Sequence, residues 1–410
     1  MAVMSAVELL SPAGTLAKGL TALHFGADAV YCGLPGFNLR RQAEGVSVAE
    51  LTHLVDTAHV RGRKVYLAAN IFPTDDDWHA LRLGLKEIGH VGVDAVIVSD
   101  PGVLDLVGEL LPGTDIHLST QANTLSSAAA AFWFRQGVRR IILARELSIA
   151  QIRRLCRAVP DGELEVFIHG AQCMAYSGRC FLSTYLAGRD ANQGECAHSC
   201  RWRYRVTEES RQGEWYEVDE GPDYTRIFSS RDLWALPVLP ELVTAGPRAL
   251  KIEGRMKSVY YTAVTTAVYR QALDSLQHAP RTWPVMKSKW EEELCRLPNR
   301  GYTTGFLTGA TDLTEIANML PPDGESAVFC GLFGERQADG VELHVKNTFD
   351  RRERLEVFRP DGLRTVRLET IRNHRGEWTE KAHSGLTVWV RPDIPVASGD
   401  LLRRTVGGKK

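Results

Sequence analysis

Residues 26–33 read GADAVYCG: a glycine, a short link with a polar residue, and then a run of apolar residues. Similar stretches are GVDAVIVSD at 92–100, GVRRIILARE at 137–146 and GPRALKIEGR at 246–255, where the apolar run ends in polar side chains. Glycine commonly ends a helix, and a continuous apolar run is typical of a strand buried on both faces. The repetition therefore predicts βα units and a parallel sheet.

Related strands follow the same logic, and at least eight strand candidates lie between Glu8 and Gly254. They include KVYLAAN from Lys64, DIHLSTQA from Asp115 and EVFIHG from Glu165. Stretches with apolar residues three and four apart, such as 48–61 and 148–158, lie between strands and predict helices. Eight strands in this length predict a TIM-like (β/α) barrel, regular or irregular.

An open doubly wound sheet is the alternative fold. It would be favoured by a glycine-rich dinucleotide fingerprint after the first strand, but the SPAG that begins at Ser11 is too short for one. We therefore favour the barrel.

In such a barrel the chemistry takes place where the strands end. Polar side chains stand at these positions: Ser11, Asn70, Asp100, Gln121, Arg145, His169, Glu253 and Arg255. They predict the lining of an active site, although any one of them could instead cap a helix.

The barrel domain is predicted to span 1–325 and a separate small β-barrel to span 326–410. Within the first domain, residues 165–225 hold a cysteine-rich signature, and from about 193 a hairpin-like insertion that breaks the βα pattern. After it, 257–277 and 290–297 read as helices. From Ala327 onward, short alternating runs separated by DG, RG and SG turns predict an all-β module with an accessory binding role.

The formal net charge of −1 gives no overall attraction to nucleic acid. The charge is uneven, however, because residues 331–410 carry a net +4 and the first 330 residues a net −5. This pattern is compatible with RNA binding and equally with a solvated surface. No apolar run could cross a bilayer, and residues 1–7 lack the features of a signal peptide, so we expect a cytoplasmic protein without a membrane partner.

Four of the eight cysteines, Cys173, Cys180, Cys196 and Cys200, fall within 28 residues of each other. The remaining four are scattered, and we expect them to be small buried residues. Thiolates are soft ligands, so the cluster predicts a metal site. The spacing matches neither zinc ribbons nor ferredoxins and leaves zinc and an iron–sulfur cluster equally supported. A catalytic thiol or chance clustering is the weaker alternative.

Directly after Cys200 the sequence reads RWRYR, which alternates cationic and aromatic residues. Arginine and aromatic planes stack on exposed bases and contact phosphate, so Arg201 and Arg203 are candidates for binding RNA. A strand with one apolar and one solvated face explains the same pattern.

The sequence resembles the collagenase-like peptidase family U32. The resemblance is most specific in EVFIHGAQCMAYSGRCFLS at 165–183 and continues through nearly the whole chain. Further matching motifs are ELLSPAG at 8–14, GADAVYCG at 26–33, HLSTQAN at 117–123, RDANQGECAHSCRW at 189–202, LKIEGRMKSVYY at 250–261 and NRGYTTGF at 299–306.

Within this family the sequence is most similar to the members that hydroxylate tRNA. The resemblance implies an oxygen-independent hydroxylase that converts the wobble uridine (position 34) to 5-hydroxyuridine, with prephenate as the hydroxyl donor. It also implies a [4Fe–4S] cluster on the four clustered cysteines. A sibling enzyme acting on ribosomal RNA or on a ubiquinone precursor is the alternative. A metal-dependent or collagenase-like peptidase is less well supported, because the sequence contains neither HExxH nor GxSxG.

Prephenate carries two carboxylates, so its pocket should offer cations, preferably arginine. We expect Arg145, Arg255 and Lys251 to bind it, since these residues lie in or at the end of barrel strands. Glu253 and His169 are the candidate catalytic residues, the second because it stands four positions before Cys173.

Overall fold

The computed structural model describes residues 7–33, 38–39, 45–173, 175–202, 219–221, 224–226, 231–309, 325–337 and 340–407. The chain forms two compact units. The first consists of Met1–Leu16, Ala29–Met256 and Arg300–Ala317, and the second of Ala17–Asp28, Lys257–Asn299 and Asn318–Lys410. The predicted domain boundary at 325 stays a prediction.

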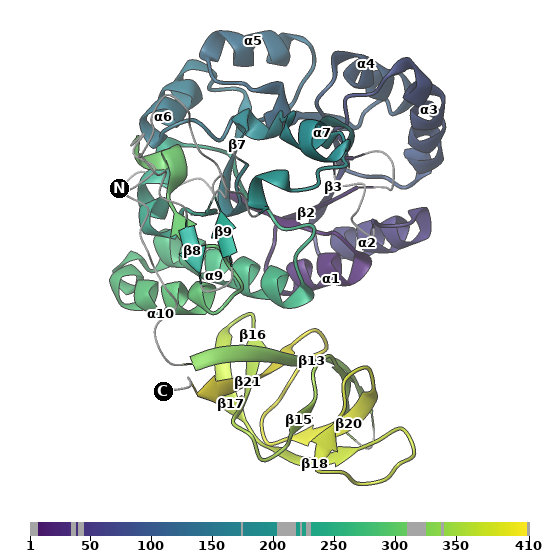
Figure 1. The fold of residues 1–410 in the computed structure, drawn as a ribbon, viewed down its shortest axis with the longest axis vertical. Coiled ribbons are helices and arrows are strands. Elements are labelled where there is room, and N and C mark those ends of the chain that lie inside the picture. Colours follow the sequence, from purple (N-terminus) through teal and green to yellow (C-terminus); the bar gives the residue numbers. More distant parts are fainter. Residues whose placement is uncertain are drawn as a thin grey trace. The chain divides into compact units, whose positions relative to one another are not determined.

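The first unit contains a closed parallel barrel, as predicted, and not an open sheet (Figure 1). Its eight strands are β1 (Glu8–Pro12), β2 (Ala29–Cys32), β3 (Lys64–Ala69), β4 (Ala95–Val98), β5 (Asp115–Leu118), β6 (Arg140–Ile142), β7 (Glu163–Ala171) and β11 (Ala249–Ile252). Closure comes from β11, which pairs in parallel with both β1 and β7. Nearly every residue of these strands is buried, which explains their continuous apolar runs.

Helices alternate with the strands along the chain. In the first unit they are α2 (Val48–Val60), α3 (Trp78–Glu87), α4 (Pro101–Leu110), α5 (Ser127–Arg135), α6 (Ile149–Ala158), α7 (Leu182–Ala187) and α8 (Leu239–Ala245); α1 (Leu16–His24) follows β1. Short 3-10 turns are η1 (Asp75–Asp77), η2 (Ile88–His90), η3 (Thr120–Ala122), η4 (Tyr176–Gly178), η5 (Ala191–Gln193), η6 (Ser199–Arg201), η8 (Leu236–Val238) and η10 (Gly305–Thr308).

Local sequence explains where the helices begin and end. Ser47 and Glu50 form a capping box at the start of α2, and Ser148 and Gln151 form another at α6. At the other end of α8, Gly246 takes a φ of +97°, which a residue with a side chain rarely adopts. The glycine at the start of the repeated motif therefore ends the preceding helix, and the next strand begins a few residues later.

The segment after β7 departs from the barrel pattern. Beyond the barrel wall, β7 pairs antiparallel with β10 (Asp232–Trp234), which in turn pairs with β12 (Tyr302–Thr303). Two short antiparallel strands, β8 (Asp219–Gly221) and β9 (Tyr224–Arg226), occupy part of the predicted hairpin-like insertion. The other residues of that insertion between 203 and 218 lie outside the described part of the chain.

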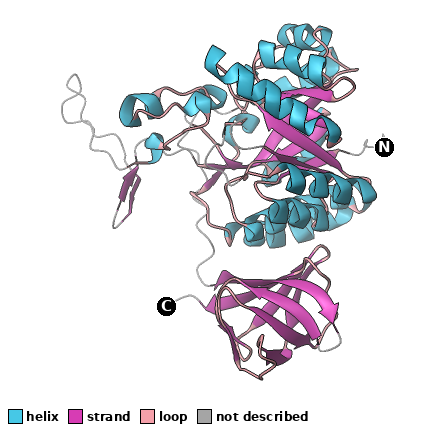
Figure 2. Cartoon of the chain, turned by 90° about the vertical axis from the view of Figure 1, so that its right-hand side faces the viewer, coloured by secondary structure: helices cyan, strands magenta, loops and turns pink. Residues whose placement is uncertain are grey.

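The second unit contains an antiparallel β domain, as predicted from the alternating runs after Ala327 (Figure 2). Its strands are β13 (Glu325–Gln337), β14 (Gly340–Val345), β15 (Phe349–Asp350), β16 (Leu355–Arg359), β17 (Gly362–Val366), β18 (Leu368–Arg372), β19 (Lys381–Ala382), β20 (Thr387–Pro392) and β21 (Leu401–Gly407). Two of these strands, β13 and β21, were not predicted from the sequence; they pair with each other near the middle of the main sheet.

The same unit contains α9 (Val259–His278), η9 (Pro280–Thr282) and α10 (Trp283–Cys295), so the second predicted helix begins seven residues earlier than expected. A buried guanidinium joins these helices to the β domain: Arg403 of β21 bonds Glu293 of α10 at 2.5 and 3.0 Å and the Tyr260 hydroxyl of α9 at 3.0 Å. Among the described helices of both units, none is long and apolar enough to span a membrane.

Charged side chains connect four strands inside the barrel. Arg140 of β6 bonds Glu8 of β1 at 2.6 and 3.1 Å and approaches Glu163 of β7 to 2.7 Å. The Glu165 carboxylate, fully buried, lies 3.4 Å from Arg140 and 3.0 Å from the Lys251 ammonium of β11. Buried charges are tolerated only when they are paired, so these five residues depend on one another.

We expect Arg140→Ala to lower the free energy of unfolding by about 3–5 kcal/mol, because it leaves buried carboxylates without their cation. Arg82→Ala is the matched control, since Arg82 bonds Glu109 at 2.7 Å on the exposed surface, where water screens the pair. Urea unfolding of both variants would test this. Equal losses of stability would contradict the role given to the buried network.

Candidate functional site

A cavity lies at the carboxyl ends of the barrel strands, where the fold predicts chemistry. Its lining includes residues from seven of the eight barrel strands or the loops directly after them, and from the cysteine-bearing segment after β7. Five of the eight predicted strand-end residues line it: Asn70, Gln121, Arg145, Glu253 and Arg255.

The other three strand-end residues have different surroundings. Asp100 accepts a hydrogen bond from the Val103 N–H at 3.1 Å and caps α4, the alternative noted for such residues. Ser11 is buried within β1. His169 is buried with its ring 5.4 Å from that of Tyr302 and does not belong to the cavity lining. The predicted catalytic role of His169 therefore stays a prediction that this geometry does not favour.

Arg145 is held at the cavity wall by three contacts. Its Nη1 donates to the Ala171 carbonyl at 3.1 Å, and the guanidinium lies 4.1 Å from the centre of the Phe167 ring. Its Nη2 is 3.8 Å from Glu253 Oε2, so the predicted anion-binding and catalytic candidates are neighbours. A guanidinium fixed against an aromatic face is well placed to bind a planar carboxylate.

Lys251 and Arg255 also line the cavity, although β11 ends at Ile252 and Arg255 follows in the next turn. The Lys251 ammonium lies 4.1 Å from the centre of the Tyr31 ring. Burial lowers the pKa of Lys251, while the paired Glu165 raises it. Arg255 Nη1 donates to Asn38 Oδ1 at 3.0 Å.

Two glycines make room for Arg255. A Cβ on Gly14 would lie 1.9 Å from the Arg255 carbonyl oxygen, and a Cβ on Gly33 would lie 2.6 and 2.7 Å from side-chain nitrogens of Asn38 and Arg255. The SPAG and YCG motifs therefore end in glycine because the loop that carries Arg255 packs directly against them. Asn38 was missed by the sequence analysis, and only Gly33, five residues earlier, pointed to this loop.

The four clustered cysteines all line this one cavity, and none is in a disulfide. Cys173 follows β7, Cys180 precedes α7, Cys196 precedes η6 and Cys200 lies within η6. Of the scattered cysteines, Cys32, Cys295 and Cys330 are buried as expected, and Cys156 is half-buried.

Backbone N–H groups point at three of the four sulfurs. The Leu182 N–H donates to Cys180 Sγ at 3.3 Å and the His198 N–H to Cys196 Sγ at 3.4 Å, and the Ala175 N–H bonds the Cys173 sulfur. Such donors stabilise negative charge on sulfur and surround cluster-ligating cysteines.

The charges around the four thiols are also consistent with a metal centre held by sulfur ligands. Burial raises the pKa of the Cys200 thiol, the Arg201 charge acts in the opposite direction, and negative charge on the other three sulfurs would raise it further. Four thiolates gathered here need cationic compensation, which a metal centre provides. Within the described ranges no three His, Cys, Asp or Glu side chains already have the arrangement of a metal site. The sulfur chemistry fits a four-cysteine centre, and coordination would draw the thiolates together.

Arg201, predicted to bind RNA, lines the cavity beside Cys200. Arg203, predicted together with it, lies outside the described residues. In total the lining contains four cationic side chains and one carboxylate, Glu253. The arrangement can bind a small anion beside the four cysteines.

Comparison with known proteins gives two family matches that together cover most of the chain. Residues 14–316 match Peptidase family U32, and residues 325–403 match the Peptidase family U32 C-terminal domain.

Three curated relatives illustrate the range of activities. The tRNA hydroxylation protein P of Escherichia coli strain K12 is 38% identical over 98% of this chain and 97% of its own. The 23S rRNA 5-hydroxycytidine C2501 synthase of the same strain is 38% identical over 66% of this chain and 40% of its own. A protein named Collagenase from Porphyromonas gingivalis strain W83 is 31% identical over 74% of this chain and 73% of its own.

We expect Gly14→Ala to destabilise the protein by about 1–3 kcal/mol, because the new methyl group collides with the Arg255 carbonyl. Gly108→Ala is the control: Gly108 lies in α4 with open space around it, so alanine there should be neutral or stabilising by about 0.5–1 kcal/mol. Thermal unfolding of both variants measures the difference. If Gly14→Ala left the melting temperature unchanged, the loop that carries Arg255 would not depend on close packing against Gly14.

Proposed function

The chain belongs to peptidase family U32, and we propose that it is an RNA-modifying member that hydroxylates the wobble uridine of tRNA at C5 without oxygen. Prephenate is the proposed hydroxyl donor and a [4Fe–4S] cluster the proposed cofactor. The observation that carries the proposal is a single cavity that combines four cysteines with an excess of cations. A relative named for tRNA hydroxylation aligns with 98% of the chain and supports the choice of substrate.

In this proposal Cys173, Cys180, Cys196 and Cys200 would hold the cluster. An iron–sulfur cluster supplies one-electron transfer or, where an iron position is open, a Lewis acid. Ligation by all four cysteines leaves no iron open, which favours electron transfer or a structural role. The N–H donors to the sulfurs would tune its potential.

Prephenate is a dicarboxylate, and two guanidinium groups of the cavity are proposed to bind it. Arg145 is fixed by Phe167 and Ala171, and Arg255 by Asn38, so both are preorganised before the anion arrives. Lys251 adds positive charge nearby, although its ion pair with Glu165 weakens the attraction that its ammonium group can exert on a bound carboxylate.

Glu253 is the proposed proton acceptor. Its carboxylate lines the cavity next to Arg145, where it would accept the proton released when hydroxyl replaces the C5 hydrogen of uridine. In the same replacement the C–O bond of prephenate would break and its electron pair would stay with the prephenate carbon, so that prephenate is the two-electron acceptor. The contact with Arg145 would also orient this carboxylate.

Hydroxylation of ribosomal RNA is the second candidate, supported by the synthase that shares 38% identity. That relative matches only 66% of the chain, against 98% for the tRNA protein, so we place tRNA first. The cysteine geometry disfavours a peptidase. A cysteine peptidase needs one nucleophilic cysteine paired with a base. His198 does line this cavity, but four thiols share it and backbone N–H donors are aimed at the sulfurs, which is a pattern of metal ligands.

Nucleoside mass spectrometry of bulk tRNA tests the substrate. We expect a deletion strain to lose 5-hydroxyuridine and its derivatives at the wobble position, and the wild-type gene to restore them. Arg145→Ala and Arg255→Ala should fail to restore them, while Arg82→Ala, on the exposed surface, should succeed. An unchanged wobble uridine in the deletion strain would exclude the tRNA function, and full restoration by both cavity variants would exclude the anion site.

Iron analysis tests the cofactor. Anaerobically purified protein should be brown and contain about four iron atoms per chain, and each single Cys→Ser change at the four ligands should reduce iron and absorbance. Cys156→Ser is the control, because Cys156 lies outside the cavity. A colourless zinc protein would contradict the cluster. A change at one iron on addition of prephenate would contradict ligation by all four cysteines.

A further inference from the structure

The cysteine-bearing segment from Gln172 to Trp202 reverses the usual distribution of polar and apolar side chains. Its aromatic residues are exposed: Tyr176 by 49%, Phe181 by 81%, Tyr185 by 86% and Trp202 by 42%. Its buried side chains include the small polar Ser177, Ser183 and Ser199. Folding alone would bury the rings and expose the hydroxyls, so the exposed rings require another explanation.

These four rings, hereafter the aromatic rim, are unusual for this protein. Of the described Phe, Tyr and Trp side chains, the large exposed ones outside the rim are Phe132 on α5 and Trp378 in the β domain. Aromatic residues of the barrel strands, such as Tyr31 and Tyr66, are buried. Exposed rings are therefore concentrated in one short segment.

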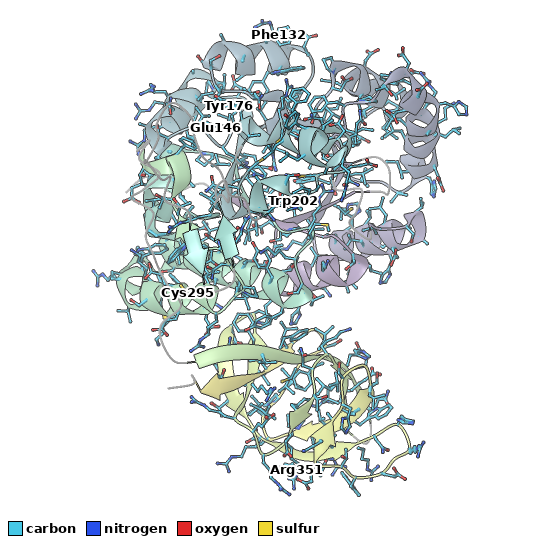
Figure 3. The ribbon with its side chains drawn as sticks, viewed as in Figure 1. Phe132, Glu146, Tyr176, Trp202, Cys295 and Arg351 are labelled. Atoms are coloured by element: carbon cyan, nitrogen blue, oxygen red, sulfur yellow. The ribbon has the colours of Figure 1, made fainter. Side chains whose placement is uncertain are left out.

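Polar anchors hold the backbone of this segment against the barrel. The Ser177 N–H and hydroxyl bond Glu146 at 2.6 and 2.5 Å, and Ser177 adopts a φ of +45°. Figure 3 labels Glu146 together with Tyr176, the residue before Ser177. Arg179 Nε donates to the Gln121 carbonyl at 2.8 Å. The Gln193 amide bonds the Phe72 carbonyl. The rings are thus presented from a fixed backbone, which reduces the entropy lost when they bind a partner.

The rim borders the cavity along the chain. Phe181 follows Cys180, and Trp202 follows Cys200 and Arg201, all three of which line the cavity. Tyr176 precedes Ser177, another lining residue. A substrate whose reacting group enters the cavity would therefore place its neighbouring groups on the rim.

We propose that the aromatic rim binds unpaired RNA bases by stacking and so holds the nucleotides that flank the target base while that base enters the cavity. The inference rests on the proposed function and specifies how the substrate is recognised. It predicts that single-stranded loops are selected over duplexes, whose bases are already stacked on each other.

Charge favours RNA over a protein partner or a second copy of this chain. Arg179, Arg189 and Arg201 lie between the first and the last ring of the segment. Arg201 Nε has no hydrogen-bond partner within the described part of the chain, and a phosphate oxygen would provide one. Bases with π faces joined by phosphates match rings interleaved with arginines.

Binding to an anticodon stem-loop RNA with an unmodified wobble uridine tests this. We expect Phe181→Leu and Tyr185→Leu each to weaken binding about fivefold or more, because leucine keeps apolar area but has no π face to stack. Phe181→Tyr and Tyr185→Phe should bind like the wild type. Phe132→Leu, an equally conservative change at an exposed ring on α5, should have no effect.

Four outcomes would contradict the proposed role of the aromatic rim. The first is unchanged affinity in both leucine variants, and the second an equal loss in Phe132→Leu. The third is a wild-type dimer that the leucine variants dissociate while RNA affinity stays constant, as measured by analytical ultracentrifugation. Equal affinity of wild type for the same RNA closed into a duplex would also contradict stacking. If the leucine variants lose affinity but wild-type protein leaves the wobble uridine unmodified, the rim stands and the proposed function fails.

Discussion

The ion pairs inside the barrel are the constraint on which the remaining structure depends. Arg140, Glu8, Glu163 and Glu165 connect β1, β6 and β7, and Lys251 joins them from β11, the strand that closes the barrel. Because a buried charge that loses its partner strongly destabilises the fold, these ion pairs fix the register of the strands that carry them. The same Lys251 lines the cavity, so the interaction that closes the fold also sets the charge at the base of the site.

The cysteine site follows from an irregularity in that closure. The register between β7 and β11 shifts at Lys251–Ile252, after which β7 continues beyond the barrel wall and pairs with β10. This extension carries the chain to Cys173 beside Arg145; burial raises the pKa of that thiol and the Arg145 charge opposes the rise. A regular barrel strand would have turned directly into a helix, without room for a segment that presents four thiols. The irregular strand therefore joins the two halves of the proposed chemistry, anion binding and the soft-metal donors.

The sequence predicted the barrel because most of its strands contain a short apolar run that follows a glycine, a pattern that can be recognised without knowledge of tertiary contacts. It failed for β13, where glycines argue against a strand. A Cβ on Gly331 would lie 2.6 Å from the His344 carbonyl oxygen of the neighbouring strand β14. The close approach of β14 therefore requires glycine at this position, and the same glycine made β13 hard to recognise as a strand from its sequence. In the site, strand-end residues such as Arg145 were predictable from position. Asn38 was not, because its bond to Arg255 joins residues 217 positions apart through a loop. Of the aromatic rim, the sequence pointed only to Trp202, through RWRYR. Phe181 and Tyr185 were not predicted, since their exposure reverses what their hydrophobicity suggests.

The cavity and the rim divide recognition between two kinds of chemistry. Charged groups anchored in the barrel suit a small anion, while rings on the cysteine-bearing segment suit bases. Removing a base from its stack costs a few kcal/mol, and each new stack on an aromatic side chain returns about 1–3 kcal/mol. Two rings that bind flanking bases would therefore offset the cost of exposing the target. Placing these rings on a segment anchored by Ser177 and Arg179 allows RNA preference to vary without disturbing the charges inside the barrel. Such separation gives a physical reason why relatives that share the barrel can be named for different RNA substrates.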